Sequence, residues 1–434
     1  MTSLVWFRND LRLADNPALS EAAERGPVVP VFVWSPDEEG DWAPGAASRW
    51  WIHHSLVALD RALRRHRSRL IVRRGPAEKA LRALAKETGA DAVLWNRRYE
   101  PAAIARDAEL KQALPGARSL PGNLLREPWA VQNRSGGPYQ VFTPFWRALE
   151  AMGDPGDPLA EPAISSPGRW PESLAVDDLG LLPEIAWDAG IARTWTPGEH
   201  GAAERLDRFT ERARRYGRDR DLPAAEATSR LSPHLHHGEV SARQVWHAVR
   251  DAAGRSGEAF LRQLAWRDFA HHLLFHFPHT TDAPLRPGFE SMPWRDDPEG
   301  LRAWQRGRTG YPLVDAGMRQ LWETGWMHNR VRLVAASFLT KHLLIDWREG
   351  ARWFWDTLVD ADLANNTLGW QWVAGSGADA APYYRIFNPT AQADRFDGDG
   401  SYRDRWLDGE VTPPIVEHAA ARQRALDAYA ATAG

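Results

Sequence analysis

The sequence of 434 residues contains no cysteine, which excludes disulfide bonds, cysteine-ligated zinc and cysteine-ligated iron–sulfur clusters. It also lacks any run of about 18 uncharged apolar residues, and its first residues carry charges where a secretory signal would need an apolar stretch. We therefore expect a cytoplasmic protein that does not cross a membrane. The net charge of −3 excludes a basic surface over the whole molecule, so a polyanion would have to bind to a local cluster of positive charge.

Tryptophan is the residue that the chain has in excess, with 23 copies, several times ordinary usage. Indole rings are large, electron-rich and usually buried, so core packing is the ordinary explanation for any single one. The excess as a whole requires a further explanation.

The first 130 residues alternate short β-branched runs with amphipathic segments. The runs predict strands at 3–8, 28–34, 69–75 and 91–96, and the segments between them predict helices at 48–65, 77–88 and 102–113. Strands separated by helices of this length favour a parallel sheet with right-handed crossovers. We predict a Rossmann-like α/β domain over residues 1–130, without the glycine-rich loops that would by themselves indicate nucleotide binding.

The remaining residues divide into a connector and a helical part. Residues 150–200 are rich in proline with little periodicity, which is typical of a long surface connection. After residue 201 the pattern is helical almost to the end. We predict a linker over 131–200 and an all-α C-terminal domain over 201–434.

Three predicted helices of this domain carry polar residues on faces that should point inward. Phe260, Gln263 and Arg267 share one face of a helix over 258–276, with Trp266 beside it. The ordinary interpretation is a buried amide and guanidinium that are satisfied by the backbone, and the alternative is the wall of a pocket.

The second face follows a break at Gly325, where Asn329, Arg332 and Leu333 lie on one side of a helix and Arg330 points elsewhere. The third face carries the residues Asp362, Asn366 and Trp370, spaced by four, with Asp360 at its start. Three helix faces that are interrupted by polar residues in one domain predict a cavity for a large ligand with polar and aromatic parts.

The segment ATSRLSPHLHHGEVS (226–240) adds a possible anion site, because Thr228, Ser229 and Ser232 precede a predicted helix. Hydroxyl residues at such places are more often ordinary helix caps.

These segments resemble the DNA photolyases and cryptochromes. The resemblance rests on WFRNDLRLADNPAL near the start, TSRLSPHLHHGEVS, WRDFAHHLL, the run from TGYPLVDAG to IDWREG, and GWQWVAGSGADAAPYYRIFNP, all in family order. The chain is most similar to the cyclobutane pyrimidine dimer photolyases of the branch near plant cryptochromes. The resemblance implies an α/β antenna domain, a linker and a helical domain that holds FAD.

The resemblance assigns flavin contacts to the helical half. Asn366 matches the position facing flavin N5, where a neutral amide can support a reduced, anionic flavin without adding a second negative charge. The positions that match the family's flavin contacts are Tyr216, Thr228, Ser229, Leu231, Ser232, Phe260, Gln263, Arg267, Asn329, Arg332, Asp360, Asp362 and Asn366.

The resemblance also gives roles to five tryptophans. Trp370, Trp347 and Trp294 match a triad that carries an electron from the surface to the photoexcited flavin. Trp266 and Trp372 match the pair that holds the dimer after it has been flipped out of DNA. The implied reaction is light-driven repair, in which an electron from excited FADH⁻ opens the cyclobutane ring.

The expected partner is UV-damaged DNA, bound by a monomer. Asn329 and Leu333 match lesion contacts, and Arg220, Arg330 and Arg395 are candidate phosphate contacts because they lie near the motifs. Gln263 stands where many cyclobutane-dimer photolyases have Glu, and Leu333 replaces a frequent Met. Gln can hydrogen-bond the carbonyl and imide edge of a lesion but cannot supply a proton.

Two alternatives follow from these departures. Gln263 is also typical of six-four photolyases, although His328 and Asn329 do not form the paired histidines of that group. A blue-light receptor of the cryptochrome type would share the cavity and the relay, but Asn366 and the tryptophan pair argue against it.

The antenna pigment that the resemblance implies is a methenyltetrahydrofolate, with 8-hydroxy-5-deazaflavin as the alternative. Glu100 in WNRRYEP is compatible with a folate contact, whereas Trp50 and Trp51 are at least as well explained as core residues.

A metal enzyme is the remaining alternative, because His271, His272, His276 and His279 cluster in the sequence. Without an HExxH motif or an acidic third ligand, satisfied core or surface histidines are the better interpretation, and we predict no metal.

Overall fold

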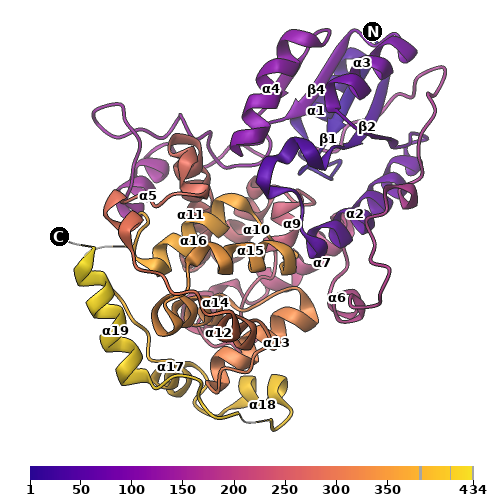
Figure 1. Cartoon of the computed structure of the whole chain (residues 1–434). Helices are drawn as coiled ribbons and strands as arrows, with labels where there is room; N and C mark the ends of the chain where they lie inside the picture. Colours follow the sequence, from indigo (N-terminus) through magenta and orange to yellow (C-terminus); the bar gives the residue numbers. More distant parts are fainter. Residues whose placement is uncertain (381–383, 411, 433–434) are drawn as a thin grey trace.

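The computed structural model describes residues 1–380, 384–410 and 412–432. The chain forms an α/β part and a helical part, joined by an extended segment that runs along the outside of both (Figure 1). Helix α19 (His418–Ala431) lies at the outer edge of the helical part, far from the sheet.

The α/β part contains the parallel sheet that the sequence predicts. The strand order is β3-β2-β1-β4-β5, and every neighbouring pair is parallel. β1 and β2 are buried along their whole length, as expected where helices cover both faces of a sheet. The strands are β1 Ser3–Phe7, β2 Val28–Trp34, β3 Ile71–Arg74, β4 Ala92–Asn96 and β5 Arg118–Leu120.

The predicted helices of this part are confirmed, with small differences at their starts. The structure has α2 at Ala46–Arg65, α3 at Ala77–Thr88 and α4 at Pro101–Ala113. α4 begins at a proline because the first turn of a helix does not need that backbone N–H. Two elements were not predicted, α1 (Pro17–Arg25) and β5, and both are short; β5 has three residues and none of them is buried.

The proline-rich segment over residues 150–200 has little regular secondary structure. Within this segment α6 (Ala189–Thr194) is the only complete α-helix, and the segment also includes the end of α5 (Phe142–Ala151) and the start of α7 (Glu199–Thr210). Part of this segment hydrogen-bonds to the α/β part, because the amide of Val28 binds the carbonyl of Ser165 at 2.9 Å and that of Leu174 binds Val72 at 3.1 Å.

The helical part begins at α7 and ends with α19. The inward-facing helices of the sequence analysis are α11, α14 and α16. The α-helices between α6 and α19 are α7 Glu199–Thr210, α8 Tyr216–Asp219, α9 Ser232–His236, α10 Ala242–Ala253, α11 Glu258–His276, α12 Pro298–Gln305, α13 Pro312–Thr324, α14 Asn329–Ser337, α15 Trp347–Thr357, α16 Leu363–Ala374, α17 Pro389–Phe396 and α18 Ser401–Leu407.

Trp51 packs α2 of the α/β part against the helical part. Its ring stacks on His237 with 5.6 Å between centroids, and its Nε1 donates to Glu239 Oε1 at 2.9 Å. The neighbouring Trp50 is 2% exposed and donates to Asp188 at 3.0 Å. Both tryptophans are therefore core residues between the two parts, in agreement with the simpler of the two interpretations.

Among the residues that the structure describes, none of the helices combines the length and the apolar character that spanning a bilayer requires.

Candidate functional site

The helical part contains a cavity of about 610 Å³. This volume lies within the range of about 300–1,000 Å³ that is typical of small-molecule and cofactor sites. Its wall includes residues of α11, α14 and α16, so the three faces that the sequence singled out do meet around one space. The polar residues on these faces are therefore not isolated interruptions of a core.

The wall that α11 contributes contains Phe260, Gln263, Trp266 and Arg267. Trp266 is held rigidly, because its ring stacks on Phe142 with 3.8 Å between centroids and 10° between planes. One face of the indole is thus covered, and the other is available to the cavity.

Arg267 satisfies its guanidinium with backbone carbonyls, as the ordinary interpretation expected. It donates to the carbonyl of Asn123 at 2.6 Å and, more weakly, to that of Leu235 at 3.4 Å. It lines the cavity all the same, so both interpretations of this residue describe part of its environment.

Helix α14 presents Asn329, Arg332 and Leu333 to the cavity. Arg332 is fixed from both sides, since Nε donates to the carbonyl of Met327 at 2.7 Å and Nη2 lies 2.8 Å from Asp360. Arg332 and Asp360 therefore form an ion pair in the cavity wall.

Arg330 points away from the cavity, as predicted. It forms an ion pair with Asp221 at 2.9 Å, and its guanidinium lies 4.4 Å from the ring centroid of Phe396. Arg395, another predicted phosphate contact, is exposed, and its guanidinium lies 5.1 Å from the centroid of the same ring. The two arginines thus flank one phenylalanine outside the cavity.

Asp362 caps the N-terminus of helix α16, and the pKa of its carboxyl is shifted further than that of any other carboxyl in the cavity wall. Its Oδ1 accepts from the amide N–H of Asn365 at 2.8 Å, and its Oδ2 lies 3.4 Å from His271 and 3.6 Å from His236. Burial alone would raise the pKa of this carboxyl, but the neighbouring histidines and Arg267 outweigh that effect and hold the pKa well below its usual range. Asp362 is therefore a carboxylate at neutral pH.

Asn366 and Trp370 follow Asp362 on the same ridge and both line the cavity. The Nδ2 of Asn366 donates to the carbonyl of Ala351 at 3.1 Å. Because a carbonyl can only accept, this bond fixes the orientation of the amide and leaves Oδ1 to accept a hydrogen bond elsewhere.

The predicted tryptophan triad extends from the cavity into the surrounding core. Trp370 lines the cavity, while Trp347 is 2% exposed and lies with it in the same hydrophobic core. Trp294 is partly buried and packs against that core from outside. The three indoles thus share one packed region in which only Trp370 reaches the cavity.

Trp372 is two residues after Trp370, on the opposite side of α16, and it also lines the cavity. Its Nε1 donates to the carbonyl of Asp379 at 3.2 Å, and the guanidinium of Arg385 lies 5.7 Å from its ring. The cavity wall also contains five further residues that the sequence analysis assigned to the site, namely Tyr216, Arg220, Thr228, Ser229 and Ser232.

Five predicted site residues do not line the cavity, namely Leu231, Trp347, Trp294, Arg330 and Arg395. The side chain of Leu231 does not reach the cavity, because it is fully buried in a hydrophobic core. Its side chain points into apolar packing while the serine that follows it faces the cavity.

Several lining residues were missed, and Arg230, Trp326 and His236 are the most informative of them. Arg230 has a positive φ of 52°, and its guanidinium lies 5.0 Å from the Trp326 ring. Arg230 and His236 are within the segment TSRLSPHLHHGEVS, so that motif was the available signal. Nothing in the sequence distinguishes Trp326 from the core tryptophans.

Among the described residues, no three His, Cys, Asp or Glu side chains come together in a way that could hold a metal ion. His272 is instead satisfied by the chain, with Nδ1 at 2.9 Å from the carbonyl of Pro128 and Nε2 accepting from the amide of Tyr139 at 3.0 Å. The simpler interpretation of these histidines is confirmed for His272.

A second cavity, of about 200 Å³, lies where the α/β and helical parts meet. Its residues include Arg8, Trp34 and Arg98, which stand at or just after the carboxyl ends of β1, β2 and β4. The strand order reverses between β1 and β4, and such a switch point is where open α/β sheets bind ligands. His236 and Ala361 line both cavities, so the two spaces share a wall.

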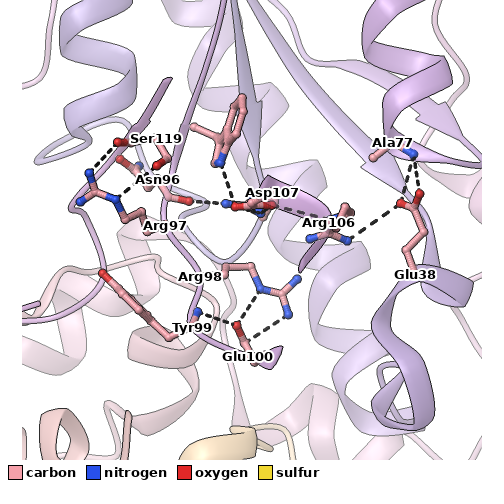
Figure 2. A network of polar contacts seen from close by, with 12 residues as sticks. Glu38, Ala77, Asn96, Arg97, Arg98, Tyr99, Glu100, Arg106, Asp107 and Ser119 are labelled. Carbon is pink, nitrogen blue, oxygen red and sulfur yellow. Dashed lines mark hydrogen bonds and ion pairs between the residues drawn. The ribbon is translucent and has the colours of Figure 1, made fainter. Parts of the chain in front are cut away.

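The wall of this second cavity contains several charged side chains, and Figure 2 shows the polar contacts of Arg98, Glu100 and Arg106 among them. Arg98 binds Glu39 at 2.7 Å and Glu100 at 3.1 Å, and Arg106 binds Glu39 at 2.9 Å. Burial alone would raise the pKa of Glu39, but Arg98 and Arg106 lower it to about 2. Among the described residues, Nε and Nη2 of Arg106 are buried without a hydrogen-bond partner. The network thus has donors to spare.

Comparison with known proteins adds an independent finding. Residues 3–163 match the family model described as DNA photolyase, and residues 260–410 match the FAD binding domain of DNA photolyase. The chain is 48% identical to the deoxyribodipyrimidine photo-lyase of Agrobacterium fabrum, over 99% of this chain and 97% of that protein.

Two further comparisons concern a plant protein and a solved structure. Identity to cryptochrome-1 of Arabidopsis thaliana is 41%, over 93% of this chain but only 62% of the length of the cryptochrome. A crystal structure of a bacterial class III photolyase from Agrobacterium tumefaciens superimposes with a TM-score of 0.95 at 48% identity, covering 100% of this chain and 98% of that one.

The packing of Trp370 against α15 leads to a prediction for Gly350. A Cβ atom at Gly350 would lie 2.0 Å from the Trp370 ring, so we expect Gly350→Ala to destabilise the protein by about 1–3 kcal/mol. Gly369→Ala is the matched control, because a Cβ there meets no atom within 4 Å and alanine favours a helix. Urea unfolding of both variants measures the difference. Equal stabilities would contradict the close packing of α15 on Trp370.

Proposed function

This chain belongs to the DNA photolyase family, and we propose how its cavities and tryptophans serve the light-driven repair of DNA. The protein is a carbon–carbon lyase that reverses cyclobutane pyrimidine dimers, and its helical part binds FAD. The observation that carries the proposal is that one cavity is lined by Asp362 and Asn366 at α16 and by two indoles, Trp266 and Trp372.

The larger cavity fits a flavin dinucleotide in size and in its donor set. Its volume is about 610 Å³, and its wall offers hydroxyls, guanidinium groups and carboxylates as well as aromatic rings. We assign the phosphate and ribityl end to Thr228, Ser229, Ser232 and Tyr216. The remaining flavin contacts are Phe260, Gln263, Arg267, Asn329, Arg332, Asp360, Asp362 and Asn366.

FAD, when bound in its reduced form, supplies the light-excited electron that opens the cyclobutane ring. The chain's own part is positioning. The free Oδ1 of Asn366 can accept a hydrogen bond from an N–H edge, and the neutral amide adds no negative charge beside an anionic ring. The carboxylates Asp360 and Asp362 are both held near cationic or imidazole partners.

Trp266 and Trp372 are assigned to hold the flipped dimer. A damaged pair of bases stacks and pairs less well than intact bases, so moving it out of the duplex costs less. Trp266 can repay part of that cost by stacking, because Phe142 fixes the ring and leaves its other face to the cavity. Asn329 and Leu333 line the same space, and Gln263 is set to hydrogen-bond the carbonyl edge of the lesion.

Phosphate contacts are assigned to three arginines, Arg220 in the cavity wall and Arg330 and Arg395 outside it. Positive charge at the cavity mouth supplies the sequence-independent part of DNA affinity. The negative charge of Asp221 partly compensates the positive charge of Arg330. The exposed Arg395 is therefore the stronger candidate of the two arginines outside the cavity.

The relay proposal concerns Trp370, Trp347 and Trp294. Trp370 reaches the cavity, Trp347 is buried, and Trp294 is only partly covered, which is the order of exposure that a path from cavity to solvent requires. The relay would restore the reduced state of the flavin after oxidation.

The second cavity is proposed to hold an antenna pigment, methenyltetrahydrofolate, with 8-hydroxy-5-deazaflavin as the alternative. Unpartnered donors of Arg106 suit the carbonyl or carboxylate groups of such a pigment, and Glu100 lies in the same wall. At about 200 Å³ the space encloses only part of a molecule of this size. The wall shared with the flavin cavity keeps the two pigments close, as energy transfer requires.

The repair activity is tested by illuminating the purified protein with DNA that carries a single thymine dimer and measuring restored thymines. We expect light-dependent restoration, and Trp266→Ala should weaken discrimination of damaged over intact DNA by roughly 5- to 150-fold, because the stack is worth about 1–3 kcal/mol. Trp322→Ala, at an exposed indole outside both cavities, is the control. No restoration would favour a light receptor, and restoration of six-four lesions alone would change the substrate.

The relay is tested by Trp294→Phe. We expect slower photoreduction of oxidised flavin in the presence of an external reductant, followed by its absorption spectrum, because phenylalanine does not donate an electron as readily as indole. Repair by protein that has been reduced beforehand should be nearly unchanged. A loss of both activities to the same degree would remove Trp294 from the relay.

The antenna site is tested with Arg106→Met. The variant should lose the second pigment and keep the flavin, since Arg106 lines only the smaller cavity. Mass spectrometry of the released pigment distinguishes folate from deazaflavin. Arg82→Met, at an exposed helix position, is the control. Retention of the pigment by Arg106→Met would exclude this cavity as its site.

A further inference from the structure

Helix α16 is followed by a tight turn, residues 375–379, that leads back to the larger cavity. Asp379 ends this turn and lines the cavity together with Trp372. The backbone amides of residues 375–377 all donate to the carbonyl of Gln371, each at 3.0 Å. Because one carbonyl gathers three successive amides, the turn is wound closely around the end of the helix.

The side chain of Gln371 anchors this end of α16 in the core. Its Oε1 accepts from the amide of Leu285 at 2.9 Å, and its Nε2 donates to the carbonyls of Thr280 at 2.7 Å and Ala283 at 2.8 Å. Gln371 is 2% exposed, so these bonds are shielded from water and are correspondingly strong. The helix end and the turn wound on it are therefore held in one position.

Asp379 has a left-handed backbone conformation, with a φ of 57°. Most side chains are strained in this region, and aspartate and asparagine are among the few residues other than glycine that tolerate it. A backbone conformation of this kind at a ligand cavity points to a role for the backbone geometry itself.

The main-chain carbonyl of Asp379 lies against the indole of Trp372. Nε1 of Trp372 donates to this carbonyl at 3.2 Å. An indole has a single polar group, which is a donor, so this bond decides which edge of the ring faces the turn. Rotation of the backbone at position 379 would move the carbonyl and release the ring.

The side chain of Asp379 lies near the support of the other indole of the cavity, Trp266. Burial raises the pKa of the Asp379 carboxyl, while the backbone N–H of Phe142 and the charge of Arg385 favour its ionised form. Phe142 is the residue whose ring stacks on Trp266. Asp379 thus contacts one of the two tryptophans directly and lies beside the residue that supports the other.

We propose that Asp379 is a positioning residue, which fixes the indole of Trp372 relative to that of Trp266 and thereby sets the discrimination of damaged from intact DNA. A stacked base needs a ring that lies parallel to it and in contact, so a displaced indole weakens the hold on a flipped dimer. Intact DNA is held mainly through its phosphates, so its affinity should not depend on the ring. The inference rests on the proposed function, which assigns the flipped dimer to Trp266 and Trp372.

The test changes the backbone preference at position 379. Asp379→Val introduces a β-branched side chain, which strongly disfavours a positive φ and should displace the carbonyl. Asp379→Asn and Asp379→Gly both accept the left-handed conformation and should keep the carbonyl in place. Full-length, flavin-loaded protein is bound in the dark to two labelled duplexes, one with a single thymine dimer and one without. The ratio of the two Kd values is the discrimination.

We expect Asp379→Val to lower the discrimination about fivefold, the factor that one hydrogen bond of ordinary net strength produces. Asp379→Asn and Asp379→Gly should leave it nearly unchanged. All three variants remove the same negative charge, so a general gain in DNA affinity is common to them and cancels in the ratio. Asp379→Ala strains the turn less than valine does, should cause a smaller loss, and keeps the test decisive if the valine variant does not fold.

Asp408→Val is the matched control for backbone strain. Asp408 also has a positive φ, of 47°, but it is exposed and lies outside the larger cavity. Valine at this position should destabilise the protein in the same way without changing the discrimination. Urea unfolding of both valine variants compares the strain, and the flavin absorption spectrum verifies that the cavity is intact.

A double-mutant cycle shows whether the effect of Asp379 passes through Trp372. Trp372→Phe keeps a flat ring but has no N–H, so it should lower the discrimination by itself. In that background Asp379→Val should cause no further loss, because no bond to the carbonyl remains to be broken. A merely structural role of Asp379 would instead give losses that add.

The outcomes separate this inference from the proposed function. Unchanged discrimination in Asp379→Val and Asp379→Ala, a loss in Asp379→Gly as large as that in Asp379→Val, or additive losses in the cycle would overturn the role of Asp379. Unchanged discrimination in Trp372→Ala, or no light-dependent repair by the unaltered protein, would contradict the proposed function itself.

Discussion

The arrangement of the helical part depends above all on the buried carboxylate of Asp362. It accepts from the first turn of α16 and lies between His271 of α11 and His236 of α9, so one side chain connects three helices. A carboxylate in the interior is tolerated only where its neighbours compensate for lost water. Because Asp362 caps the start of α16, Asn366 and Trp370 reach the cavity one and two turns later.

The excess of tryptophan has several physical causes. Trp51 stacks on His237 and packs the two parts of the chain together, whereas Trp266 forms a rigid cavity wall because Phe142 supports it. Trp347 fills the core behind Trp370. A large flat ring with one N–H donor suits all three tasks, since it covers much surface and loses little conformational entropy when it is buried.

Much of the site could be predicted from the sequence, for reasons that particular residues illustrate. The spacing of Phe260, Gln263 and Arg267 identified an inward face because helical periodicity needs only local sequence. Leu231 shows the limit, because the motif marks its segment but only the packing shows that its side chain enters the core. Trp326 was missed, since a cavity tryptophan and a core tryptophan look alike in a sequence.

The sequence by itself determined the alternation of strands and helices, the parallel sheet, the positions of the inward faces and the family, because these follow from local periodicity and from motifs. Only the tertiary structure decided which faces meet. The bond from Arg220 to Gln263 and the wall that His236 and Ala361 give to both cavities join residues distant in the chain. Such contacts depend on how whole helices pack, and no short stretch of sequence contains that information.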